Sequence, residues 1–128
     1  MCVRGASALQ GVLDEFAGKP VRAFIVWEPV LPTDHGPPSR TALSQLHDGR
    51  ADQYWDAERL LSNRVLAEAR RGVPQLAVFS GDQEAAWDLV AIYPPGARWQ
   101  GDLPTPVYVG NPVVAAIDSV RARLAAGP

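Results

Sequence analysis

Val21-Arg-Ala-Phe-Ile-Val-Trp27 is the stretch that decides the fold, because nearly every residue in it is apolar, β-branched or aromatic. Such a run is typical of a strand that is covered on both faces, inside a sheet with helices on each side. A helical pattern precedes it, and further helical patterns alternate with shorter strand-like runs after it. The sequence therefore predicts an α/β fold.

Composition bounds the size and the class of the protein. A chain of 128 residues that is 47% hydrophobic is expected to form a single domain, 1–128, with its own core. The formal net charge of −2 gives no basic surface for nucleic acid. No apolar run is long enough for a membrane span, and Met1–Gly5 lacks the apolar core of a signal peptide, so we expect a cytoplasmic location by default.

The helices are expected on either side of the central run. One should begin close to Val3 and end before Gly18 and Pro20, with an apolar stripe at Leu9, Val12, Leu13 and Phe16. Later helices are expected after Ser39, after Asp56 and after Asn111-Pro112, each of these residues being a good start signal. The buried faces of the last two should carry Leu61, Val65 and Ala69, and then Ile117, Val120 and Leu124.

The remaining strands are shorter. Gln53–Trp55 is expected at an edge of the sheet, and Trp87–Tyr93 should pair antiparallel with Val107–Val109 across the turn Pro94-Pro95-Gly96. Val73–Gly81 fits either a strand or an extended connection. Glu28–Pro38 is rich in proline and should form a loop.

Few residues indicate a chemistry. Cys2 is the single cysteine, which excludes an internal disulfide, and we expect neither a metal nor a cofactor. His35 and His47 each stand beside an aspartate but lack metal-ligand spacing, so we interpret them as solvated loop residues. Glu28 follows the central strand, at the end where parallel sheets place their sites, and is either a base for a thiol or an exposed carboxylate.

The order of these elements resembles the thioredoxin fold, closest to thiol–disulfide oxidoreductases of the cytochrome-maturation type. In Cys2-Val-Arg-Gly-Ala-Ser-Ala-Leu9, Cys2 matches the second cysteine of the family's Cys-x-x-Cys motif, Ser7 its proline and Leu9 its leucine. The resemblance implies a three-layer α/β/α sandwich with a mixed sheet and a C-terminal hairpin plus helix. It also implies a catalytic thiol at Cys2 and substrate contacts at Glu28, Trp87 and Gly110.

Two departures from the family pattern limit this implication. The attacking cysteine and the first strand would precede Cys2, and no proline stands near Ala85-Ala86, where the family has a cis-proline. Either the start is shortened or the chain is a degenerate member that kept the scaffold. We therefore expect a weak or inactive reductase whose partner is a protein or small-molecule thiol or disulfide. The alternative is a non-catalytic thioredoxin-fold module that binds a partner or forms a homodimer through an exposed sheet edge.

Overall fold

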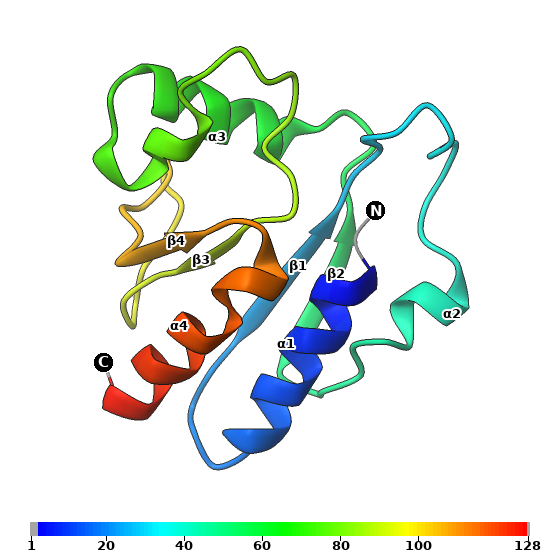
Figure 1. Ribbon diagram of the computed structural model, residues 1–128, viewed down its shortest axis with the longest axis vertical. Coiled ribbons are helices and arrows are strands. Elements are labelled where there is room, and N and C mark those ends of the chain that lie inside the picture. Colours follow the sequence, from blue (N-terminus) through cyan, green and yellow to red (C-terminus); the bar gives the residue numbers. More distant parts are fainter. Residues whose placement is uncertain (1–2, 128) are drawn as a thin grey trace. The chain divides into compact units, whose positions relative to one another are not determined.

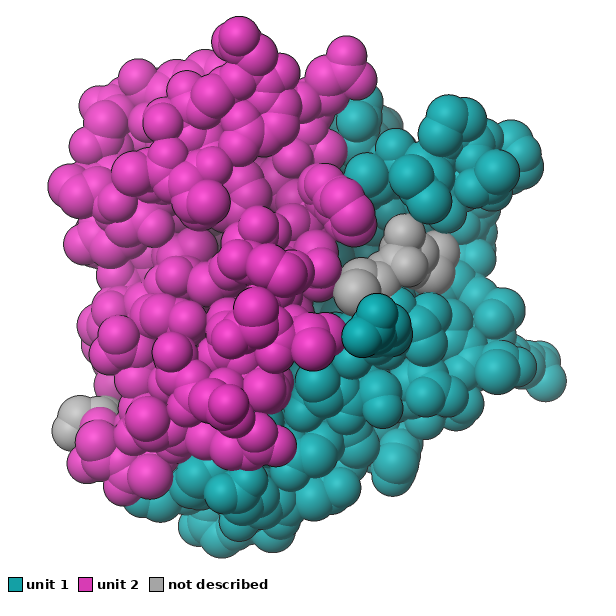
Figure 2. All heavy atoms as spheres, in the orientation of Figure 1, with its two compact units in different colours: residues 1–59 teal, residues 60–128 magenta. Residues whose placement is uncertain are grey.

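The computed structural model describes residues 3–127 and has mixed α/β architecture (Figure 1). The chain divides into two compact units, one up to Arg59 and one from Leu60 onward (Figure 2). The α/β class is thereby confirmed, and the thioredoxin-like sandwich and the single domain stay predictions. Within the described residues, no helix combines the length and the hydropathy needed to cross a membrane.

The first unit is a two-stranded parallel sheet with helices packed on it (Figure 1). Its elements are α1 (Val3–Glu15), β1 (Ala23–Trp27), α2 (Arg40–Leu43) and β2 (Ala51–Trp55). The strands pair in register from Ala23 with Ala51 to Trp27 with Trp55. The predicted strands at 21–27 and 53–55 are both confirmed, as is a helix that covers Val3–Glu15 and ends before Gly18.

The core of this unit lies on one face of the sheet. Alternate residues of the strands meet side chains of both helices and of the segment after α2, in a cluster formed by Ala6, Leu9, Ile25, Trp27, Leu43, Leu46, Ala51 and Trp55. Gln53 lies among these apolar groups with its amide fully used: its Oε1 accepts from Trp27 Nε1 at 2.9 Å, and its Nε2 donates to the carbonyls of Leu43 and Leu46. A half-buried amide with all these partners costs little to desolvate.

Coverage of β1 on both faces was the wrong prediction. Phe24, which alternates with Ile25 and Trp27 along the strand, has 65% of its surface exposed. The apolar run therefore supplies one buried face and one face that carries an exposed aromatic ring.

The second unit contains α3 (Leu60–Arg70), the 3₁₀ helix η1 (Pro74–Phe79), β3 (Val90–Ile92), β4 (Tyr108–Gly110) and α4 (Val113–Ala126). β3 and β4 pair antiparallel, as the sequence predicts, with Val90 opposite Gly110 and Ile92 opposite Tyr108. The core of this unit is formed by side chains of α3, of η1 and of the segment before β3. Its buried residues are Val65, Leu66, Ala69, Leu76, Phe79 and Ala86. Ser62, also buried, accepts a hydrogen bond on its Oγ from the backbone N–H of Ala86 at 2.7 Å.

Two local predictions before the hairpin are wrong for physical reasons. Asp56 does not cap α3, because α3 starts four residues later, at Leu60. The backbone N–H of Asp56 donates to the Trp27 carbonyl and so continues the pairing of the sheet. Arg59, the residue before α3, has a left-handed φ of 56°. Residues 74–79 form neither a strand nor an extended connection. They form a 3₁₀ helix, whose three-residue turn places Leu76 and Phe79 on the same buried side.

The hairpin and the last helix also differ at their ends. β3 is shorter than predicted because Asp88, with φ of 54°, interrupts the extended backbone. Asn111 does not cap α4: the cap position is Pro112, and the Asn111 side chain donates instead to the carbonyls of Trp87 and Asp88. The Ser39 cap of α2 is confirmed by its Oγ, which accepts from Ala42 N at 3.2 Å.

Candidate functional site

The predicted catalytic residue, Cys2, lies outside the described residues. The residue that follows it, Val3, is the first of α1, a helix of 13 residues. The first turn of α1 contains no acidic side chain. A helix start has backbone N–H groups without intrahelical partners and the positive end of the helix dipole, both of which favour an anion such as a thiolate.

Glu28 directly follows β1 in the first unit and is half-buried. The loop that it opens is organised by Asp34, whose Oδ2 accepts from the backbone N–H groups of Leu31 at 2.9 Å and Val30 at 3.0 Å. These two bonds hold the pKa of Asp34 below its ordinary value, with the Leu31 bond the larger cause. The predicted loop is confirmed, and its first turn is fixed by this carboxylate.

Trp87 and Gly110 belong to the second unit, where Asn111 connects them. Asn111 follows Gly110 in the chain, and its Nδ2 donates to the Trp87 carbonyl at 2.8 Å and to the Asp88 carbonyl at 3.0 Å. The backbone around two predicted substrate contacts therefore meets at the start of α4. The Trp87 side chain itself is 47% exposed.

A hollow of about 280 Å³ lies at this place, between β4 and the first turn of α4. It is lined by Val78, Tyr108, Val109, Gly110, Asn111, Ala115 and Ala116. A Cβ at Gly110 would overlap the Ala116 methyl and lie 2.6 Å from the Tyr108 hydroxyl oxygen. Glycine at position 110 is thus required by packing, and the volume of the hollow is near the lower end of ligand-pocket volumes.

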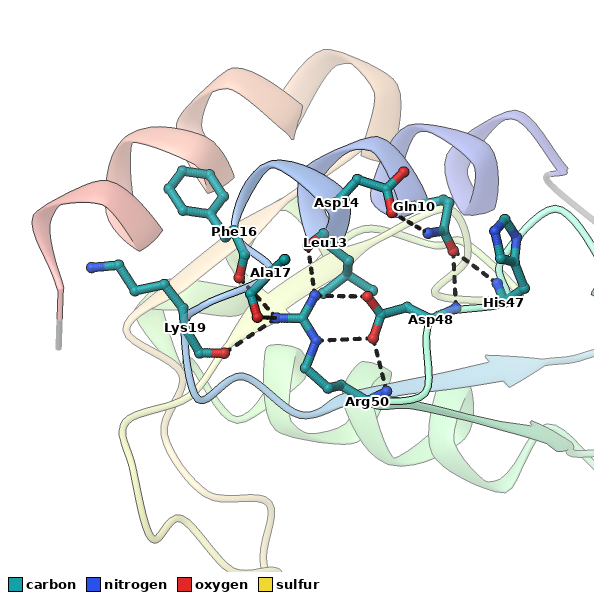
Figure 3. A network of polar contacts seen from close by, with 9 residues as sticks. All are labelled: Gln10, Leu13, Asp14, Phe16, Ala17, Lys19, His47, Asp48 and Arg50. Carbon is teal, nitrogen blue, oxygen red and sulfur yellow. Dashed lines mark hydrogen bonds and ion pairs between the residues drawn. The ribbon is translucent and has the colours of Figure 1, made fainter.

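The densest polar network in the first unit centres on a residue that the sequence did not single out, Arg50 (Figure 3). Its guanidinium forms a two-bond ion pair with Asp48, through Nε at 2.9 Å and Nη2 at 2.7 Å. The same group donates to carbonyl oxygens at the end of α1 and just after it, which belong to Leu13, Phe16, Ala17 and Lys19. Arg50 therefore satisfies helix-end carbonyls and attaches α1 to the start of β2.

Gln10 completes this network from inside α1. Its Oε1 accepts from the backbone N–H groups of His47 at 2.8 Å and Asp48 at 3.1 Å, and its Nε2 donates to Asp14 (Figure 3). The ion pair with Arg50 lowers the pKa of Asp48 to about 2. His47 is exposed, as the sequence predicts for a solvated loop residue, whereas the neighbouring Asp48 anchors Arg50.

Comparison with known proteins adds no relative to this description: no protein-family model, no curated protein and no solved structure matches the chain.

Proposed function

We propose that this chain is a thioredoxin-like protein related to thiol–disulfide oxidoreductases, with Cys2 as its reacting thiol and little reductase activity of its own. The observation that carries the proposal is α1, whose described residues begin at Val3, directly after the only cysteine of the sequence. The thioredoxin resemblance expects this arrangement, a cysteine at the start of a helix that leads into a parallel strand.

The later elements support the same proposal. β1 follows α1, and the antiparallel pair of β3 and β4 precedes the terminal helix α4. The thioredoxin resemblance implies a strand after the helix of the cysteine and an antiparallel strand pair before the last helix, and these elements agree with that part of its order. In this arrangement Glu28, Trp87 and Gly110 are the proposed substrate contacts.

The chemistry proposed for Cys2 is thiol–disulfide exchange. Its thiolate attacks one sulfur of a disulfide, a new sulfur–sulfur bond forms, and the other sulfur leaves as a thiolate. Release of the protein then needs a second thiol, and Cys2 is the only one in the chain. The expected product is therefore a mixed disulfide that persists until an external thiol resolves it.

Incubation with oxidised glutathione, followed by intact-mass measurement, tests the proposal. The folded chain should gain one glutathione on Cys2 faster than the same chain in urea, and Cys2→Ser should gain none. In an insulin-reduction assay the chain should add little to the rate given by dithiothreitol alone. Equal adduct rates in the folded and unfolded chains would reject the proposed activation of Cys2, and strong insulin reduction would reject the single-thiol chemistry.

A second candidate function is non-catalytic assembly, and the exposed aromatic residues of the first sheet favour it. Phe24 on β1 is 65% exposed and Tyr54 on β2 is 52% exposed. They are diagonal neighbours on one face, since Phe24 pairs with Asp52 and Val26 with Tyr54. Exposed aromatic rings that lie close together are typical of interaction surfaces.

Sedimentation at micromolar concentration tests this second function. The native chain should sediment as a dimer and Phe24→Ser as a monomer. Trp99→Ser is the matched control. Trp99 is also an exposed aromatic residue, with 52% of its surface exposed, but it belongs to the loop between β3 and β4 and not to the first sheet. A native chain that sediments as a monomer would contradict the assembly role.

A further inference from the structure

A cluster of four charged residues in the second unit joins α3 to the long connection between β3 and β4. Arg64 and Glu68 lie one turn apart on α3, and Arg71 directly follows the helix. Asp102 comes from the connection, more than 30 residues further along the chain. Neither the thiol chemistry nor the hollow beside α4 uses any of these four residues.

Glu68 organises the two arginines. Its side chain is only 10% exposed, and its Oε1 accepts from Arg64 Nη2 at 3.0 Å and from Arg71 Nη1 at 3.2 Å. One buried carboxylate therefore fixes two guanidinium groups beside each other and neutralises one of their two positive charges. One positive charge is left for another anion.

Asp102 supplies that anion. Its Oδ1 forms an ion pair with Arg64 Nη2 and lies 3.9 Å from Arg71 Nη1. The carboxylate is 82% exposed and belongs to a segment without helix or paired strand of its own, apart from a single bridge with Gln100. An exposed ion pair of this kind is worth little in free energy, so an external anion at moderate concentration competes with it.

The arginines also retain unused donors. Arg64 Nε is shielded from solvent and forms no hydrogen bond with any residue that the structure describes. A guanidinium has five N–H donors, and an oxyanion with three or four oxygens accepts from more of them than a single Asp102 oxygen does. The arrangement suits a phosphate group better than it suits the carboxylate that occupies it.

We propose that Arg64 and Arg71, held in place by Glu68, form a phosphate-binding site, and that Asp102 occupies this site as an internal competing carboxylate. Phosphate binding displaces Asp102 and releases the part of the β3–β4 connection around Asp102 from α3. Leu103, the next residue, packs on the core of the unit and limits the released segment to the residues before it.

Titration with inorganic phosphate at constant ionic strength tests the site, with amide NMR shifts of the full chain as the readout. Asp102→Asn removes the competitor and a like charge, so it should tighten phosphate binding by about fivefold or more. Arg71→Gln should weaken binding by a similar factor. Arg71 is 62% exposed, so this substitution is expected to leave the fold intact.

Two controls make the result decisive. Arg121→Gln removes an arginine of a comparable ion pair, with Asp118 on α4, and should not change phosphate binding. Sulfate should compete with phosphate, whereas chloride at the same ionic strength should not. Phosphate binding that is equal in the native chain, Asp102→Asn and Arg71→Gln would overturn the proposal, as would the absence of shifts at residues 64–71 in Asp102→Asn.

Discussion

Arg50 and Asp48 show at the scale of single residues how one ion pair fixes two elements. The pKa of Asp48 is lowered from 3.8 to about 2, chiefly by hydrogen bonds from the Arg50 side chain and then by the Arg50 backbone N–H. A carboxyl whose pKa falls on folding stabilises the folded state when it is ionised. This stabilisation is complete above the unfolded-state pKa and is lost as the pH falls through the folded-state pKa.

The first prediction follows from that pH window. Arg50→Met should lower the thermal unfolding temperature at pH 5, and its difference from the native chain should shrink as the pH falls from about 4 to 2. A residual difference should persist at pH 2, because Arg50 also donates to the α1 carbonyls. Arg121→Met, which disrupts an exposed ion pair on α4, is the control and should have little effect at any pH. A difference between native and Arg50→Met that does not change with pH would contradict the role of Asp48.

Two glycines allow a matched test at the scale of elements. Gly72 lies just beyond α3 with φ of +87°, a conformation in which a Cβ is strained. Gly11 lies on the exposed side of α1, and a Cβ there would meet no atom within 4 Å. The same substitution should therefore act with opposite sign at the two positions.

Urea unfolding measures both effects. Gly72→Ala should lower the free energy of unfolding by about 1 kcal/mol, and Gly11→Ala should raise it by about 0.5–1 kcal/mol, since alanine is the better residue within a helix. Two changes of the same sign would mean that the end of α3 or the course of α1 differs from this description.

Helices were predicted better than their ends, and the reason is visible at Asp56 and Asn111. The helices α1, α3 and α4 were identified by apolar residues that recur every three or four positions. This pattern can be read within one short stretch of sequence, because it follows from the burial of one helix face. The helix starts depend on long-range hydrogen bonds that fix the preceding segment: the Asp56 N–H donates to the Trp27 carbonyl, and Asn111 Nδ2 donates to the carbonyls of Trp87 and Asp88. Those partners are more than 20 residues away, so no local pattern predicts these bonds.

For the whole molecule, sequence and structure agree on the α/β class, on a strand at residues 23–27 and on the C-terminal hairpin with its helix, but β1 lies in a sheet of two strands and is not the central strand that the sequence predicted. Of the predicted site residues, Trp87 and Gly110 approach each other through Asn111, and Glu28 stands at the carboxyl end of β1. The Arg50 network was missed because its partners in α1 precede it by more than 30 residues. The only local indication of this network in the sequence was the acidic and basic pair Asp48 and Arg50, separated by one glycine.

The central claim, that Cys2 is a thiol activated by the start of α1, is tested most directly by its pKa. The rate of alkylation by iodoacetamide should be followed from pH 5 to 10 for the folded chain and for the chain in urea, with Cys2→Ser as the unlabelled control. The account predicts a midpoint below about 8.5 in the folded chain and a return to about 8.5 in urea. A midpoint in the folded chain at or above the urea value would contradict it.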